Sequence, residues 1–453
     1  MHVFFRFYYF SKIFIPLKGA FYRFFYCFKC SKKLFFKEAL FLMCNIYIVD
    51  AIMGAGKTTA AIQKMKTDNI NNYIFITPFL DEVDRIIKEC SEKNFIQPIP
   101  KSKGGKLENI HRLIGNNQNI ASTHSLFQMF NNYTKELLKE KDYILILDEV
   151  FNVVETVKIT SEDLKVVLQE FAHIEDGLLV WDKPNYNGRF NDIKSMADNK
   201  SLVVYKDTVL LWNFPIEFFK LFKEAYILTY MFKAQIQRYY YDYYNVKYKY
   251  LSVKKEKKPN GSCSVYSFSE NGTLPEYVYD LKNKIHIFNE DKINTIGESD
   301  DNKHPLCVNW FKRELNLPPE NRYLLIKLKN NLVNYFNNKT KSTSYEAMWT
   351  TFKDYKSFLA GKGYTKGFVE MNARATNKYK HKTNLAYCVN RFLNPIISQF
   401  FQQKNIKILE REYALSELIQ WIWRSAIREG NEINLYIPSI RMRTLLIDWI
   451  NSF

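Results

Sequence analysis

Residues 44–59 read CNIYIVDAIMGAGKTT. The apolar, β-branched start of this stretch predicts a strand over 44–49, and the residues from Lys57 to Lys66 have a helical pattern. The turn between them contains Gly54 and Gly56, where backbone N–H groups can approach an anion because glycine has no Cβ. A strand, a glycine-rich turn and a helix in this order predict a phosphate-binding loop in a parallel α/β sheet.

The side chains after this turn suit the phosphates of a nucleotide. Lys57 is placed to reach the β- and γ-phosphates, and the Thr58 hydroxyl to coordinate Mg²⁺. The expected nucleotide-binding residues are Ala51, Gly54, Ala55, Gly56, Lys57, Thr58 and Thr59.

A second acidic motif is expected beside this loop. Residues 144–147 form a hydrophobic strand that ends in Asp148 and Glu149. Asp148 would hold the magnesium, partly through water, and Glu149 would orient and deprotonate an attacking water. Two adjacent acids favour hydrolysis over phosphoryl transfer to a small molecule.

The chain organisation follows from alternating strand and helix patterns. Strands are expected at 73–77, before Thr123, at 143–147 and at 225–229, with helices between them, one of them over 80–89. Strands that are apolar on both faces indicate a parallel sheet covered on both sides. We expect one α/β lobe over 43–240 and a second over 241–453, after a tyrosine-dense stretch and a charged, Pro/Gly-containing break.

With these motifs the chain resembles superfamily-two helicases of the DEAD/DEAH-box-like group. Ala51-x-x-Gly54-x-Gly56-Lys57-Thr58 is similar to their first motif, and Asp148-Glu149-Val150-Phe151 to their second. Residues 228–232, LTYMF, resemble the motif that couples ATP to nucleic acid, with Thr229 as the coupling residue and Met231 in place of the usual second hydroxyl.

The second half carries two further similarities to this group. Residues 374–377, RATN, resemble the fifth motif, and residues 420–428, QWIWRSAIR, resemble the sixth. We expect a helix from about 415 to 429, on which Gln420, Arg424 and Arg428 share one face because they lie four residues apart. Two arginines and an amide on that face could contact the γ-phosphate of ATP. Which of the two arginines would be the arginine finger stays open.

The resemblance implies two RecA-like lobes with ATP and Mg²⁺ between them. It also implies a nucleic-acid helicase or translocase, DNA being favoured over RNA, of the kind found in phages and mobile elements of Gram-positive bacteria. Catalytic roles are then expected for Lys57, Glu149, Gln420, Arg424 and Arg428. The implied nucleic-acid contacts are Thr77, Pro78, Thr123, Arg374 and Asn377.

Two other functions stay open at this stage. One is an ATPase of the same fold that remodels or packages nucleic acid without separating strands. The other is a membrane-peripheral ATPase, for which the basic aromatic N-terminus is the support. The five tyrosines between Tyr239 and Tyr244 could stack on unpaired bases, although packing into a core is the more common role of such residues.

Composition places the chain among globular proteins with a polyanionic partner. The chain has 453 residues, 47% of them hydrophobic, and a formal net charge of +18. An AT-rich genome would also enrich lysine, so the charge supports nucleic-acid binding without proving it. Seven dispersed cysteines suggest free thiols in a reducing cytoplasm and no zinc site, because the Cys27 and Cys30 pair has no second pair.

Residues 1–42 differ from the rest of the chain. They are crowded with Phe and Tyr and carry eight Lys/Arg against Glu38. Cations interrupt every apolar run, so we expect no stable membrane insertion. We interpret this stretch as a non-native or disordered extension before a start at Met43, and the alternative is a membrane-surface segment.

Overall fold

The computed structural model describes residues 44–100, 105–257, 264–298, 304–371 and 377–453, without the side chains of Asp291 and Asn377. The expected extension at 1–42 and the start at Met43 lie outside these residues.

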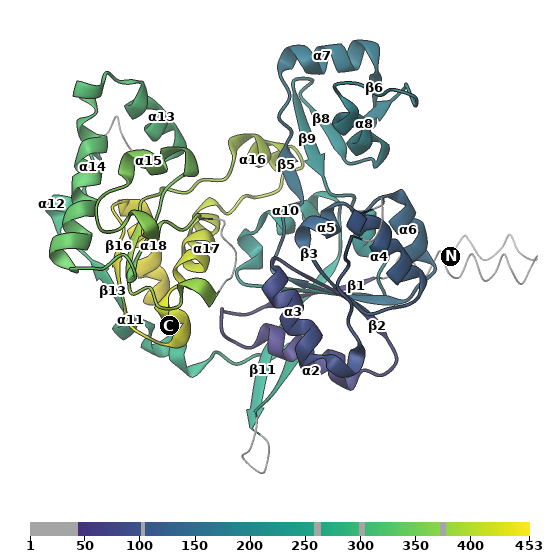
Figure 1. Ribbon diagram of the computed structural model, residues 1–453, viewed down its shortest axis with the longest axis horizontal. Helices are drawn as coiled ribbons and strands as arrows, with labels where there is room; N and C mark the ends of the chain where they lie inside the picture. The colour runs from purple at the N-terminus through teal and green to yellow at the C-terminus, as the bar shows by residue number, and fades with distance from the viewer. Residues whose placement is uncertain (1–43, 101–104, 258–263, 299–303, 372–376) are drawn as a thin grey trace, which may run out of the picture. The chain divides into compact units, whose positions relative to one another are not determined.

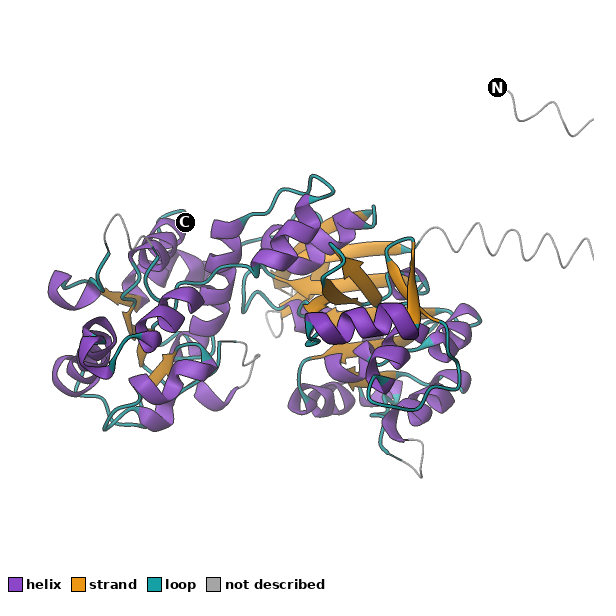
Figure 2. Ribbon diagram, turned by 90° about the horizontal axis from the view of Figure 1, so that it is seen from above, coloured by secondary structure: helices purple, strands orange, loops and turns teal. Residues whose placement is uncertain are grey.

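Seven strands form the first sheet, in the order β12-β11-β1-β10-β4-β2-β3. Figure 1 labels β1, β2, β3 and β11 of this sheet. Neighbouring strands run parallel, except for the antiparallel pair of β11 and β12. The central strands are buried on both faces, and helices lie on both sides of the sheet (Figure 2), as a parallel sheet requires. The strands are β1 (Asn45–Asp50), β2 (Asn72–Thr77), β3 (Ile120–Thr123), β4 (Tyr143–Asp148), β10 (Glu224–Thr229), β11 (Tyr248–Lys257) and β12 (Ser264–Ser269).

The helices of this lobe include the two that the sequence predicts most clearly, at 57–66 and 80–89, and both are confirmed within one residue. The helices are α2 (Lys57–Thr67), α3 (Leu80–Glu89), α4 (Gly105–Gly115), α5 (His124–Gln128), α6 (Asn132–Lys139), α9 (Glu217–Lys220) and α10 (Ile236–Tyr243).

A small antiparallel domain interrupts the first lobe between β4 and β10. Its sheet has the order β5-β9-β8-β7-β6 and packs against α7 and α8 around its own apolar cluster (Figure 1). The sequence did not predict it because strands of three to five residues are too short for a clear apolar or alternating pattern. Its elements are β5 (Val154–Thr156), α7 (Ser161–Glu170), β6 (Ala172–Glu175), β7 (Leu178–Trp181), α8 (Asn191–Asp198), β8 (Leu202–Tyr205) and β9 (Val209–Asn213).

The second lobe is built on four parallel strands in the order β13-β16-β15-β14. The predicted α/β class, with two mainly parallel sheets flanked by helices, is therefore confirmed. The strands of the second lobe are β13 (Ile285–Phe288), β14 (Ala347–Thr350), β15 (Asn384–Tyr387) and β16 (Ile433–Tyr436). Its helices are α11 (Leu281–Lys284), α12 (Asp291–Asn294), α13 (Val308–Asn316), α14 (Tyr323–Asn334), α15 (Lys356–Leu359), α16 (Pro395–Gln402), α17 (Glu410–Ile422) and α18 (Ile440–Ile450).

The expected lobe boundary at 240/241 needs correction. It falls inside α10, and the first sheet continues through β11 and β12 to Ser269. The sequence did not predict β11 as a strand because many of its residues are charged and face solvent, although its backbone pairs with β1.

The tyrosine-dense stretch belongs to the core. Tyr239, Tyr240 and Tyr241 are fully buried, so the interpretation as packing residues is confirmed and base stacking by these three is ruled out. Trp421 and Trp423 are buried as well. Among the described residues, no helix has both the length and the apolar character needed to cross a membrane.

Candidate functional site

The turn after β1 has the backbone that a phosphate-binding loop needs. Gly54 has a φ of 81°, and Gly56, the N-cap of α2, has a φ of 91°. Both values lie in the left-handed region that glycine adopts without steric cost. A Cβ on Gly56 would lie 2.4 Å from Cδ1 of Tyr266, so the space also requires glycine. Ala51 and Ala55 are buried and fix the two ends of the turn.

Lys57 begins α2 and points back over this turn. Its Nζ donates hydrogen bonds to the carbonyl oxygens of Ala51, at 2.5 Å, and Ile52, at 3.1 Å. Burial lowers the pKa of Lys57 to about 8, although the carboxylates of Asp148 and Asp50 favour its charged form. A half-buried lysine held beside the loop by backbone carbonyls is placed to reach phosphates bound there.

Thr58 and Asp148 meet across the carboxyl ends of the strands. The Thr58 hydroxyl donates to Oδ1 of Asp148 at 3.3 Å. Burial, followed by the charges of Glu149 and Glu82, raises the pKa of Asp148 to about 7. A hydroxyl and a half-buried carboxylate side by side are hard oxygen donors that fit Mg²⁺, which takes few protein ligands and is otherwise held by phosphates. No group of three His, Cys, Asp or Glu that could hold a metal occurs in the described ranges.

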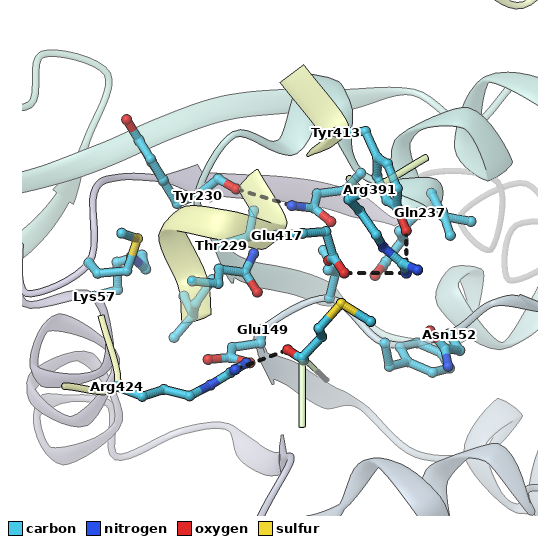
Figure 3. A pocket seen from close by; sticks show the side chains of 18 residues that line it. Lys57, Glu149, Asn152, Thr229, Tyr230, Gln237, Arg391, Tyr413, Glu417 and Arg424 are labelled. Carbon is cyan, nitrogen blue, oxygen red and sulfur yellow. Dashed lines mark hydrogen bonds and ion pairs between the residues drawn. The ribbon is translucent and has the colours of Figure 1, made fainter. Parts of the chain in front are cut away.

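Glu149 stands in an unusual backbone conformation at the end of β4. Its φ is 62°, in the left-handed region that non-glycine residues seldom adopt. Its N–H donates to the carbonyl of Leu228 on the adjacent strand β10 at 2.9 Å, which holds the turn in place. The turn directs the carboxylate of Glu149 into the cavity shown in Figure 3.

The expected helix over 415–429 needs correction, because α17 ends at Ile422. Ser425 has an extended backbone, and its hydroxyl donates to the carbonyl of Ile422 at 2.7 Å, which closes the last turn. Residues 426–429 then form a separate 3₁₀ turn. Gln420, Arg424 and Arg428 therefore share no helix face, yet all three line the same cavity.

Arg424 is a buried arginine that lines the cavity together with Glu149. Only 5% of its surface is exposed, and Nη1 donates to the carbonyl of Met371 at 2.9 Å (Figure 3). Burial lowers its pKa to about 10, while the charge of Glu149 favours its cationic form. Its Nε has no hydrogen-bond partner within the described part of the chain.

Two connected cavities join these residues. The loop cavity, of about 330 Å³, is lined by the phosphate loop, Thr59 and the acidic pair together with Gln420, Arg424 and Arg428. The inner cavity, of about 290 Å³, is lined by Thr229, Gln237, Arg391, Tyr413 and Glu417. They share Met53, Lys57, Glu149, Gln420 and Arg424, so residues from both lobes meet in one continuous site.

The expected nucleic-acid contacts are placed unevenly. Thr77 and Pro78 line the loop cavity, where Thr77 is fully buried and its hydroxyl has no partner among the described residues. Thr123 ends β3 and lines neither cavity. Arg374 and the side chain of Asn377 lie outside the described residues.

Comparison with known proteins identifies relatives over almost the whole chain. The SPbeta prophage-derived uncharacterized protein YonV of Bacillus subtilis (strain 168) is 43% identical over 424 residues, which cover 90% of this chain and 100% of that protein. The chain belongs to the YonV family. Residues 154–212 match the YonV middle domain, and residues 279–450 match the YonV C-terminal Rossmann-like domain.

The YonV family domains correspond to parts of the structure described above. The middle domain is the small antiparallel sheet with α7 and α8, and the C-terminal Rossmann-like domain carries the parallel sheet of the second lobe.

Solved structures with a distant likeness to this YonV-family protein were also found. "XPD_APO" has a TM-score of 0.45 at 10% identity, over 91% of this chain and 97% of that one. S. tokodaii Xpd4 has a TM-score of 0.39 at 11% identity, over 92% and 96%. The DUF1998 helicase MrfA bound to DNA has 0.32 at 9%, over 92% and 48%.

One acidic residue that links two parts of the site was not predicted from the sequence. Asp50, the last residue of β1, accepts hydrogen bonds from the backbone N–H groups of Met231 at 2.8 Å and Phe232 at 3.0 Å. It ties the phosphate loop to the segment after Thr229. An acid directly before the loop was the signal that could have found it.

A second missed group lies in the inner cavity. Nη2 of Arg391 donates to the Tyr413 hydroxyl at 2.9 Å and pairs with Glu417 at 3.4 Å (Figure 3). No short motif marks these residues, because they come together only when β15 and α17 pack against each other.

Proposed function

We propose that this chain hydrolyses ATP with Mg²⁺ and couples hydrolysis to movement along, or unwinding of, nucleic acid. The observation that carries this proposal is the continuous site in which a phosphate-binding loop, a half-buried acidic pair and an arginine of the second lobe meet. The net charge of +18 supports a polyanionic partner, with DNA favoured over RNA.

Each residue has a role in this proposal. The N–H groups of the loop and Lys57 bind the phosphates, and Thr58 and Asp148 hold Mg²⁺, which supplies charge neutralisation on the phosphates. Glu149 takes the proton of the attacking water, and Arg424 supports the negative charge that develops on the γ-phosphate.

Coupling would run through the strand ends. Asp50 links the phosphate loop to Thr229 and the segment after it through two hydrogen bonds. A change in the order of the loop would therefore reach Thr229, which lines the inner cavity. Arg424 belongs to the second lobe, so phosphate binding draws on both lobes at once.

The test is the ATPase rate of the full chain without nucleic acid and with single-stranded DNA, duplex DNA or RNA. Lys57→Ala is the background, and Glu149→Gln should retain ATP binding while slowing hydrolysis by about 100-fold or more. An ATPase rate that one of these nucleic acids stimulates supports a nucleic-acid motor and identifies the nucleic acid along which it moves. A Lys57-dependent ATPase rate that no nucleic acid changes would support ATP hydrolysis and contradict its coupling to nucleic acid.

A strand-displacement assay separates unwinding from translocation or remodelling. ATP-dependent release of the labelled strand supports unwinding. Stimulated hydrolysis without release would assign movement or remodelling without strand separation.

A further inference from the structure

A third cavity adjoins the inner cavity on the side away from the phosphate loop. It measures about 990 Å³ and shares Asn152, Ile236, Arg391 and Tyr413 with the inner cavity. We call it the side groove. Its walls come from strand β5 of the middle domain, the start of α13, and the segment 390–398 after β15.

Neutral polar side chains and one lysine without an ion pair in the described ranges line the side groove. Lys312 and Asn309 on α13 are exposed, and Lys312 forms no ion pair within the described ranges. The two acids of the groove are engaged with the protein, since Glu410 accepts from the N–H of Leu393 at 2.8 Å and Glu155 from Nδ2 of Asn152 at 2.7 Å. Amides and a free cation are the groups that bind phosphate and sugar oxygens.

An aromatic ring stands in this polar setting. Phe392 is half-buried, with the guanidinium of Arg441 4.3 Å from its ring centre and the ring of His304 at 5.1 Å. Arg441 is itself held by donating to Asn390 Oδ1 at 2.9 Å. A ring fixed by a stacked arginine is a platform on which an unpaired base can stack.

The middle domain closes one end of the groove by contacting the second lobe. Helix α16 lies beside β5 (Figure 1), and Lys206 donates to Oε1 of Gln399 at 3.2 Å. The rings of Tyr205 and Phe400 also meet at 5.9 Å. The groove is therefore bounded by both the middle domain and the second lobe.

We propose that the side groove binds one strand of nucleic acid, with Lys312 and Asn309 on the backbone and Phe392 against the bases. This proposal rests on the proposed function, because it supplies that motor with its track. A single strand is required, since bases in a duplex are already stacked on each other and cannot lie on Phe392. Arg391, shared by the side groove and the inner cavity, connects the strand to the ATP site.

The first experiment measures fluorescence anisotropy of labelled oligo-dT, oligo-U and duplex DNA with the full chain at several salt concentrations. For Lys312→Ala/Asn309→Ala we expect weaker binding of a single strand and a salt slope reduced by about 0.7, the value for one phosphate contact. The matched control is Lys327→Ala, an exposed lysine on α14 outside the groove, which should bind as the wild type does. Melting temperatures check that all three proteins are folded.

The second experiment keeps the native chain and photo-cross-links it to an oligonucleotide containing 5-iodouracil. We expect the cross-linked peptide to contain Phe392, because this base reacts with an aromatic side chain stacked on it. A cross-link confined to peptides outside the groove would overturn the proposal, as would unchanged affinity and salt slope in the double variant.

Failure of the proposed function would look different. Wild-type protein that hydrolyses ATP through Lys57 yet binds no nucleic acid would remove the motor and the groove's ligand together. Binding of duplex DNA alone would keep a nucleic-acid partner and overturn the single-strand site.

Discussion

At the scale of single residues, the site depends on backbone conformations that side-chain chemistry alone would not favour. Glu149 and Met231 both have positive φ, and each is held by a hydrogen bond to a neighbouring strand, from Glu149 N–H to Leu228 and from Met231 N–H to Asp50. Such conformations cost about 1–3 kcal/mol each for a non-glycine residue. Their position at the ends of β4 and just after β10 suggests that they aim functional groups into the cavities.

Gly56→Ala should disable nucleotide binding. The new Cβ would clash with Tyr266, and the alanine would have to adopt a φ of 91°. The turn would therefore change shape, or its left-handed backbone would cost about 1–2 kcal/mol. We expect at least a tenfold loss of affinity for a fluorescent ATP analogue. Gly115→Ala is the control, because a Cβ there meets nothing within 4 Å, and it should bind the analogue normally.

Arg424, rather than Arg428, should be the arginine that hydrolysis needs. Arg424 is buried beside Glu149 and lines both cavities, whereas Arg428 is exposed and lines one. We expect Arg424→Ala to lower the single-turnover rate about 1000-fold or more, the scale of an arginine finger, with a much smaller effect for Arg428→Ala. The reverse order of the two effects would transfer the role to Arg428.

At the scale of elements, the junction between α2 and β2 shows how the chain turns the phosphate-loop helix back into the sheet. Asp68 caps the end of α2 and accepts hydrogen bonds from Ile70 N–H at 2.9 Å, Asn71 N–H at 3.1 Å and the Tyr73 hydroxyl at 2.5 Å. Burial acts to raise the pKa of Asp68, but these hydrogen bonds outweigh it and hold the pKa well below its usual range.

Asp68→Asn should therefore destabilise the protein at neutral pH and less so in acid. A carboxylate whose folded pKa is depressed stabilises the fold above its unfolded pKa of about 3.9, and that stability is lost as the pH falls toward the folded value. We expect a loss of about 1–2 kcal/mol in the free energy of unfolding at pH 7, shrinking below about pH 4, measured by urea titration. Asp84→Asn on the exposed face of α3 removes the same charge and should change stability little at either pH.

At the scale of the whole molecule, three cavities form one path. The loop cavity and the inner cavity share Glu149 and Arg424, and the inner cavity and the side groove share Arg391 and Tyr413. Ligands at the two ends are coupled only if they favour the same arrangement of the lobes, and the coupling is then reciprocal.

Tyr413→Phe should weaken this coupling while keeping the ring that packs in the core. The variant loses the hydroxyl that accepts from Arg391, while the ion pair with Glu417 and the contact of the guanidinium with the ring at position 413 remain. We expect the change in oligonucleotide affinity caused by a non-hydrolysable ATP analogue to shrink by about 0.5–2 kcal/mol. Tyr323→Phe on the exposed face of α14 is the control, and an unaltered ratio in Tyr413→Phe would contradict the path.

Local sequence was sufficient where the chemistry lies within a few consecutive residues. The loop from Ala51 to Thr58, the helix at 80–89 and the strand ending in Asp148 were all predicted within one residue, because neighbouring side chains and glycines set the backbone there. The candidate roles of the loop and of the two acids follow from residue types within these short stretches and stay predictions.

Only the tertiary structure decided what depends on distant parts of the chain. β1 pairs with β10, about 180 residues later, and Asp50 receives its partners from that pairing. The middle domain, the continuation of the first sheet to Ser269 and the Arg391–Tyr413 contact arise in the same way. The physical reason is that strand pairing and burial are set by non-local packing, which overrides the weak local preferences of short strands such as β5 and exposed ones such as β11.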